Sequence, residues 1–197
     1  MRMSYWKLLV LCLSAVPLSG CGFNSLQEQD EAIKATWGQV LNQYQRRYDL
    51  VPNLVRVVQA YARHEKSVFE EVTQARAAVG VLRIDDKAYD KQEVVAEYSK
   101  VQDRLGKAIY NVLVVAENYP QLKADGVFRD LQAQLEGTEN RISYARQRYI
   151  GAVYNFNVTV RSFPSNLTAM ALGYVAKPGF SVANEPDIST APRVKIN

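Results

Sequence analysis

Apolar residues recur along most of the chain at the three- and four-residue spacing of an amphipathic helix. One such pattern covers residues 26–48, and a second covers residues 54–79. Pro52 lies between them. Because proline has no backbone N–H and its ring clashes with the preceding turn, we expect the helix to break or kink near Val51.

Two more helical patterns follow, over residues 94–115 and 128–163, and no stretch alternates like a strand over a useful length. Four helices of about 25 to 40 residues joined by short links predict an all-α fold, an antiparallel up-and-down four-helix bundle with long helices. We place this bundle at residues 26–164. Residues 165–197 are predicted to form a short helix near 166–172 and an irregular C-terminal tail, since several prolines follow.

The N-terminus has the layout of a secretory signal. Arg2 and Lys7 precede a short apolar run, and Leu18-Ser19-Gly20-Cys21 follows, which resembles the lipobox of bacterial lipoprotein precursors. We therefore predict a signal peptide at 1–20, lipidation of Cys21 and a short tether at 21–25. The alternative is an uncleaved anchor helix, but the apolar run is too short to span a bilayer.

A lipid on Cys21 would keep the mature chain on a membrane, because two or more acyl chains anchor a protein stably. The absence of aspartate at position 22 favours the outer membrane, facing the periplasm, in a Gram-negative host. In another host the expected location is the outer leaflet of the cell membrane. In either case the turns at 49–52 and 119–120 should meet at a membrane-distal tip, and the loop at 80–91 should lie near the membrane.

Charge and cysteine content narrow the function classes. Both cysteines, Cys12 and Cys21, fall in the processed region, so the exported domain has no disulfide. Without Arg2 and Lys7, the 24 Lys and Arg fall to 22, against 20 Asp and Glu. This near-balance gives no electrostatic reason to expect nucleic-acid binding.

Several well-known catalytic side-chain sets are missing from the sequence. The exported domain has one histidine, His64, and no thiol nucleophile, and the position three before His64 is Tyr61 rather than the glutamate of a di-iron site. Zinc-protease, phosphate-loop and serine-hydrolase motifs are also missing from the sequence. We expect no catalytic residues, no cofactor and no metal, and we interpret His64 as a polar neighbour on a helix flank.

Glu65 falls on the apolar stripe of the second pattern, at the expected level of Glu139 and one turn from Arg141. A buried carboxylate needs a cation or several donors, or its pKa rises until it is neutral. We interpret Glu65, Glu139 and Arg141 as a candidate buried polar layer that fixes the register of the helices. A proton-handling or ligand-binding site and a solvent-facing Glu65 are the alternatives.

A second candidate site is the interaction tip, where two predicted turns should meet. Its residues are Arg46, Arg47, Asp49, Pro52, Asn53, Glu117, Asn118 and Tyr119. These side chains either cap helices and pair with one another, or form a recognition surface on a rigid scaffold.

Several motifs in order resemble the LemA family of bacterial envelope proteins. They are residues 45–55 (QRRYDLVPNLV), 61–65 (YARHE), 116–124 (AENYPQLKA), 135–142 (LEGTENRI) and 161–164 (RSFP). The resemblance implies an up-and-down four-helix bundle on a membrane anchor, commonly a transmembrane helix, for which a lipid would substitute here. It implies no catalytic residues.

The leading hypothesis is a non-enzymatic, membrane-tethered scaffold or adaptor lipoprotein that binds envelope proteins or itself. The alternative is a periplasmic binding protein for a cell-wall glycan or small ligand. A third hypothesis is an enzyme that uses the carboxylates of Glu65, Glu136 and Glu139. A pocket of a few hundred Å³ lined by these groups would favour the ligand-binding hypothesis.

Overall fold

The computed structural model describes residues 22–82 and 88–180, and within these ranges it contains α-helices, one 3-10 helix and no strand. The all-α prediction is confirmed. The signal peptide at 1–20, Cys21 and residues 181–197 of the tail lie outside the described residues. The elements are α2 (Phe23–Tyr61), α3 (Lys66–Val81), η1 (Ala88–Asp90), α4 (Gln92–Ala116), α5 (Pro120–Ala124), α6 (Gly126–Arg161) and α7 (Ser165–Leu172).

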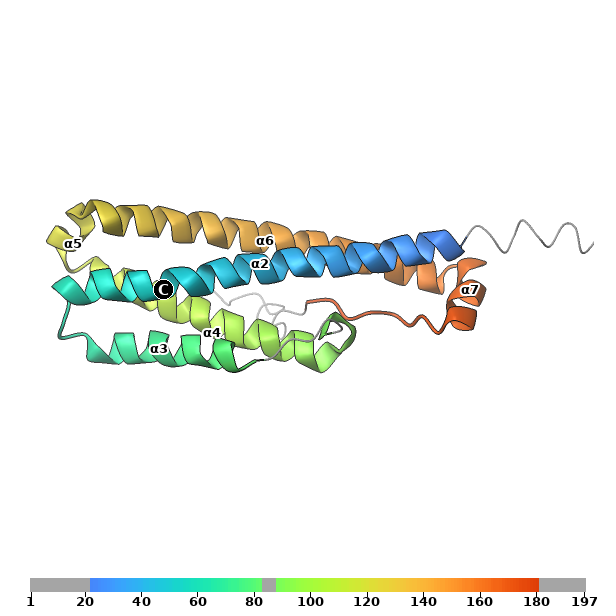
Figure 1. Cartoon of the computed structure of the whole chain (residues 1–197), viewed down its shortest axis with the longest axis horizontal. Helices are drawn as coiled ribbons and strands as arrows, with labels where there is room; N and C mark the ends of the chain where they lie inside the picture. Colours follow the sequence, from blue (N-terminus) through green and yellow to red (C-terminus); the bar gives the residue numbers. More distant parts are fainter. Residues whose placement is uncertain (1–21, 83–87, 181–197) are drawn as a thin grey trace, which may run out of the picture.

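The long helices lie side by side in an elongated array (Figure 1). Helices α2 and α4 run in one direction, and α3 and α6 run in the opposite direction. The most extensive packing is between α2 and α6 and between α3 and α4. Because α2 and α6 are the longest helices, their pair extends past α3 and α4 at the end where α7 lies, while α5 lies at the opposite end.

The predicted break at Pro52 is wrong, because α2 continues through this proline to Tyr61. A proline at position 52 leaves the carbonyl of Tyr48, four residues earlier, without its helical donor. The side chain of Arg76 in α3 supplies one, since its Nε donates to the Tyr48 carbonyl at 3.3 Å. The Arg76 guanidinium also stacks 3.9 Å from the centre of the Tyr48 ring. A contact from another helix therefore replaces the bond that Pro52 removes.

The chain reverses instead at residues 62–65, where the backbone N–H of Glu65 donates to the carbonyl of Ala62 at 3.1 Å. The second helix therefore starts at Lys66 rather than just after Pro52. Phe69, Val72 and Ala75 are its buried residues. The apolar stripe predicted from residue 54 to 79 belongs to two helices, which is why its middle member Glu65 falls in the turn.

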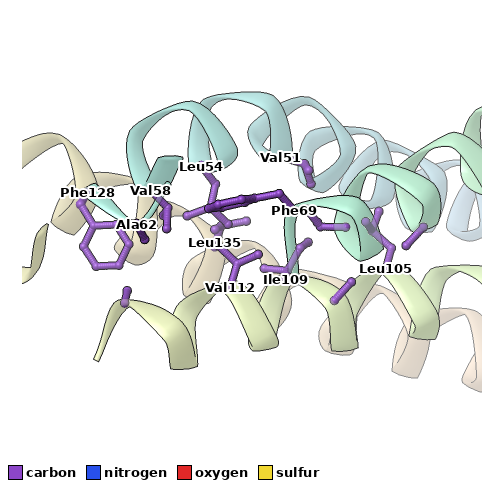
Figure 2. Close-up of a cluster of buried hydrophobic side chains, with 14 of the residues drawn as sticks. Val51, Leu54, Val58, Ala62, Phe69, Leu105, Ile109, Val112, Phe128 and Leu135 are labelled. Carbon is purple, nitrogen blue, oxygen red and sulfur yellow. The ribbon is translucent and has the colours of Figure 1, made fainter. Parts of the chain in front are cut away.

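Two hydrophobic cores lie one after the other along the array. The α5-side core joins α2, α3, α4 and α6, and its side chains converge between these helices in Figure 2. The α7-side core contains mostly larger residues, among them Trp37, Tyr44, Tyr149 and Phe156. On α2 the first core begins at Val51 and the second ends at Tyr44, so the two are separated by about two helical turns.

The segment after α7 closes the α7-side core. The Phe180 ring lies 5.7 Å from Trp37 and 5.2 Å from Tyr149, between ring centres. Lys177 contacts Asp30 of α2 at 2.5 Å and Asp90 of η1 at 2.6 Å. Burial acts to lower the pKa of Lys177, yet these two carboxylates leave it raised. Residues 173–180 are irregular, as predicted, and they pack onto the helices.

We expect the Arg76→Ala substitution to lower the free energy of unfolding by about 1 to 2 kcal/mol, because it leaves the Tyr48 carbonyl without a donor. In a Pro52→Ala background the new backbone N–H bonds this carbonyl, so the same substitution costs less. Urea denaturation of the four proteins measures the coupling. Equal losses in both backgrounds would show that Arg76 does not compensate for Pro52.

Candidate functional site

Arg47 lies between the two hydrophobic cores with only 3% of its surface exposed. It occupies the inward stripe of α2, three residues after Tyr44 and four before Val51, both of which are buried. Because Arg47 falls on this stripe, its permanent positive charge lies in the interior. Such a charge is stable there only with a counter-ion and hydrogen-bond acceptors around it.

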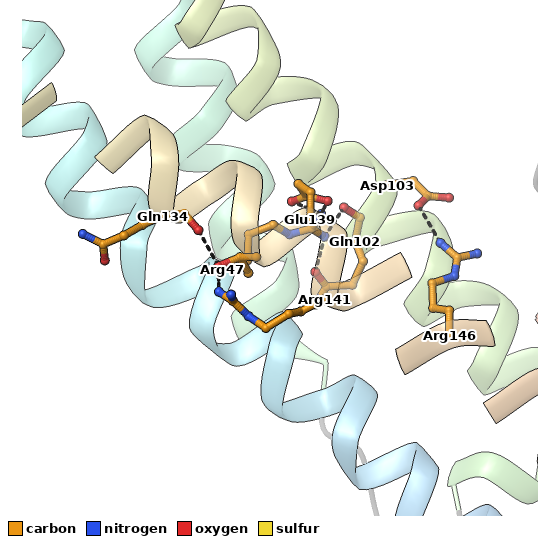
Figure 3. A network of polar contacts seen from close by, with 8 residues as sticks. Arg47, Gln102, Asp103, Gln134, Glu139, Arg141 and Arg146 are labelled. Carbon is orange, nitrogen blue, oxygen red and sulfur yellow. Dashed lines mark hydrogen bonds and ion pairs between the residues drawn. The ribbon is translucent and has the colours of Figure 1, made fainter. Parts of the chain in front are cut away.

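The Arg47 guanidinium finds these partners on two other helices (Figure 3). Its Nη1 donates to the Glu139 carboxylate of α6 at 3.0 and 3.2 Å. Its Nη2 donates to the backbone carbonyl and to Oε1 of Gln102 in α4, both at 2.7 Å. A side chain at Gly106 would place a Cβ 3.1 Å from Nη1, so glycine leaves room for the guanidinium. We call Arg47, Gln102 and Glu139 the Arg47 layer.

Within the part of the chain that the structure describes, several polar atoms in the layer, and on the helices that carry it, are buried without partners. Among the described residues, Arg47 Nε, Gln102 Nε2, the Tyr44 hydroxyl and Ser99 Oγ have no hydrogen-bond partner. Burial raises the pKa of Tyr44 to about 12, although Arg146 and Arg47 act in the opposite direction. Tyr44 is therefore a neutral phenol at physiological pH, and the charge of the layer is balanced by Glu139. With these contacts, Arg47 of α2 can act as a clamp that holds α4 and α6 in place.

The predicted polar layer is corrected in two of its three members. Glu139 is in the observed layer, but Arg141 lies on the exposed side, where it donates to Gln43 at 3.1 Å and to Thr138 at 3.0 Å. Glu65 lies in the turn before α3 and accepts a hydrogen bond from the Tyr119 hydroxyl at 3.2 Å. The Glu65–Arg141 pair is absent because the helix breaks at residues 62–65 instead of at Pro52.

The predicted interaction tip does not assemble as expected, because α2 does not turn at Pro52. Arg47 is buried in the layer. Arg46, Asp49 and Asn53 lie exposed along α2, where Asp49 accepts from Gln45 at 2.8 Å. Glu117, Asn118 and Tyr119 do lie at a helix end, between α4 and α5, and Glu117 pairs with Lys123 at 2.5 Å.

The end of the array near α5 is built from phenol–carboxylate hydrogen bonds, and we call it the α5 end. The Tyr61 hydroxyl donates to Asp125 Oδ2 at 2.8 Å. Asp125 Oδ1 accepts from the backbone N–H groups of Val127 at 2.7 Å and Phe128 at 3.2 Å, which caps α6. Together with the Tyr119–Glu65 hydrogen bond, these contacts connect three helix termini to the start of α3. They are the C-terminal ends of α2 and α4 and the N-terminal end of α6.

An open cavity of about 720 Å³ lies beside the α5 end, between α2 and α3. Charged, polar and apolar side chains line it, including Arg63, Lys66, Phe69 and Glu70. A second cavity of about 500 Å³ lies further along the same two helices and reaches Tyr98. Neither cavity is lined by Glu65, Glu136 or Glu139.

Metal-ligating clusters and membrane spans can be assessed over residues 22–82 and 88–180. In these ranges no group of three or more His, Cys, Asp or Glu side chains could hold a metal ion. None of the helices described there combines the length and the apolar character that a bilayer span requires.

Sequence reasoning missed Arg47 as the cation of the layer, although a signal was present. Arg47 falls on the apolar stripe of the first helical pattern. Placing a turn at Pro52 assigned it to the tip and hid its position in the middle of a longer helix.

We expect Glu139→Ala to lower the free energy of unfolding by about 2 kcal/mol, because it leaves the buried Arg47 charge without a counter-ion. The loss is smaller than for a fully buried pair, since the Glu139 side chain is 48% exposed. In an Arg47→Met background the same substitution should cost little. Urea denaturation measures both losses.

The matched control is Glu136→Ala, one turn earlier on α6, where the exposed carboxylate accepts one bond from Gln132. It should change stability by no more than about 0.5 kcal/mol. Equal losses for the two glutamates would contradict a clamp at Glu139.

The Tyr61 hydrogen bond, together with the N–H of Phe128, holds the pKa of Asp125 below its ordinary value of 3.8. A lowered folded-state pKa means stability that is present above the unfolded value and is lost as the pH falls through the folded one. In the Tyr61→Phe variant, the melting temperature should therefore fall by a smaller amount than in the wild type when the pH is lowered through this range. Tyr110→Phe, at an exposed tyrosine on α4, should leave the pH profile unchanged.

Comparison with known proteins identifies the family of this chain. No match is found among curated proteins. A family model described as the LemA family matches residues 36–196, which include the Arg47 layer, the α5 end and α7. The match covers most of the chain, and the chain therefore belongs to the LemA family.

Proposed function

We propose that this protein is a non-enzymatic lipoprotein of the bacterial cell envelope, which holds a rigid helical scaffold on a membrane. The sequence Leu18-Ser19-Gly20-Cys21 supports a lipid anchor on Cys21. The proposed cellular location is the outer membrane, facing the periplasm, in a Gram-negative host. In another host it is the outer leaflet of the cell membrane. Membership of the LemA family is consistent with an envelope protein.

The observation that carries this proposal is the continuity of α2. The helix starts at Phe23, two residues after Cys21, and continues for 39 residues to Tyr61. At ~1.5 Å per residue this is ~58 Å of helix. Since Arg76 compensates for Pro52, the helix has no break at its proline. An anchor at Cys21 would therefore hold the α5 end far from the membrane.

The alternating directions and pairwise packing of the long helices support the antiparallel up-and-down four-helix bundle that the sequence predicts. We infer that α2, α3, α4 and α6 are its members. In this arrangement the Arg47 layer and the Arg76 contact resist sliding of the helices. A bundle held in one register is suited to presenting a surface at a fixed distance.

We propose the cavity beside the α5 end as the surface that binds envelope proteins or a second copy of this chain. It is open and combines the cations Arg63 and Lys66 with the ring of Phe69 and the carboxylate of Glu70. Charged and polar side chains beside an apolar ring are found in many protein interfaces.

The ligand-binding and enzyme hypotheses receive less support. Glu65 lies at the α5 end, Glu139 lies in the Arg47 layer, and Glu136 bonds Gln132 on the surface of α6. The three carboxylates do not converge on either cavity described between α2 and α3. A glycan or small molecule would therefore have to bind without them.

Photo-crosslinking in cells tests the binding surface. A photo-activatable residue at position 63, in the cavity, should give a discrete crosslinked band to another envelope protein or to a second copy. The control position is Tyr154, which is 67% exposed on α6 away from the α5 end. The same bands from both positions, or none from position 63, would contradict an adaptor that binds through this cavity.

Metabolic labelling tests the anchor separately. The wild-type chain should incorporate palmitate and remain in the membrane fraction, whereas Cys21→Ala should do neither. Palmitate on the variant, or none on the wild type, would exclude Cys21 as the lipidation site.

A further inference from the structure

The chain from residue 162 to residue 176, which includes α7, has no charged side chain. Four of its large apolar residues are mostly exposed, one of them Val175 at 73%. The other three lie on α7 or just before it: Phe163 at 78%, Leu167 at 57% and Met170 at 77%. Soluble proteins seldom gather large apolar side chains in this way without covering them. We call these three residues the α7 apolar face.

The structure holds α7 firmly while leaving this face open. Ala169 is its buried residue, and Gly173 ends the helix in a left-handed conformation with φ of 72°. The backbone N–H of Tyr174 then donates to the Ala169 carbonyl at 2.9 Å, and the Tyr174 ring packs edge-on against Phe156 at 5.6 Å between centres. Helix α7 therefore packs on the core through the small side chain of Ala169, and the larger side chains of the α7 apolar face project outward.

The position of α7 places this face beside the proposed lipid anchor. Helix α7 packs against the start of α2, and both lie at the end of the array opposite α5 (Figure 1). A Cβ at Gly22 would lie 3.5 Å from the Cα of Ser165, so the residue that follows Cys21 touches the first turn of α7. Neighbouring Cα atoms are about 3.8 Å apart. A lipid on Cys21 would therefore bring α7 to the bilayer surface.

We propose that the α7 apolar face inserts into the membrane interface beside the acyl chains of Cys21. Amphipathic helices that lie in the interface bury their apolar side chains about 5 to 10 Å into the boundary between headgroups and acyl chains. The exposed cation Arg161 immediately precedes the uncharged segment. The inference rests on the proposed lipid anchor and adds a second membrane contact, which orients the helices where an acyl chain alone leaves them free to tilt.

Spin labels on the full-length protein test this contact. Phe163→Cys and Met170→Cys carry nitroxides on the α7 apolar face, and Val127→Cys is the matched control, 59% exposed at the start of α6. The protein purified from membranes is reconstituted in vesicles of phosphatidylethanolamine and phosphatidylglycerol. We expect nitroxides at 163 and 170 to become more accessible to oxygen and less accessible to a water-soluble nickel chelate, and the nitroxide at 127 to show no change.

Nitroxides at 163 and 170 that stay fully accessible to the nickel chelate on vesicle-bound protein would overturn the proposal. Dipolar broadening between labels in detergent that persists on the vesicles would also overturn it, because a second copy would then cover the face. Palmitate incorporation in the same cells is measured separately. If it is absent, the anchor is excluded and so is the position of α7 beside acyl chains, whereas a lipid-exposed reading at 163 and 170 would support membrane contact by α7 alone.

Discussion

Arg47 carries a positive charge into the middle of the helices, where it is separated from water. Burial of this kind is tolerated only because Glu139 of α6 neutralises the guanidinium and Gln102 of α4 accepts two of its hydrogen bonds. Sliding either helix by one turn, about 5.4 Å, would remove these partners. Apolar packing tolerates such shifts far better than a buried charge does, and we therefore propose that the Arg47 layer specifies the register of α2, α4 and α6.

A second arginine, Arg76 of α3, connects α3 to α2. Arg76 bonds the carbonyl that Pro52 leaves without a donor and stacks on the ring of Tyr48. The contact satisfies the backbone of α2 and fixes the position of α3 at once. Two guanidinium groups thus link α2 to its three long neighbours, and both act near the middle of α2, where an unsupported proline would otherwise bend it.

The two ends of the array differ in chemistry. At the α5 end, Tyr61 and Tyr119 donate to carboxylates at the turns, so this end is polar and held together by hydrogen bonds. At the other end, residues 174–180 fold back over the extended part of α2 and α6, with Lys177 between two aspartates. That segment buries the aromatic core and leaves α7 facing outward. Our proposal that one end is directed to a membrane and the other to a partner uses this difference.

Periodicity in the sequence by itself determined that the chain is helical, because an apolar residue every three or four positions has one efficient way to be buried. It also placed the Tyr119–Pro120 turn and the short helix after Pro164, where proline and local composition act within a few residues. Tertiary structure decided whether Pro52 would end a helix, because the compensating donor comes from Arg76, in another helix. It likewise decided that Arg47 is buried and that Glu65 lies in a turn. Hydrogen bonds and charges are satisfied in three dimensions, so their partners cannot be found from spacing along one helix.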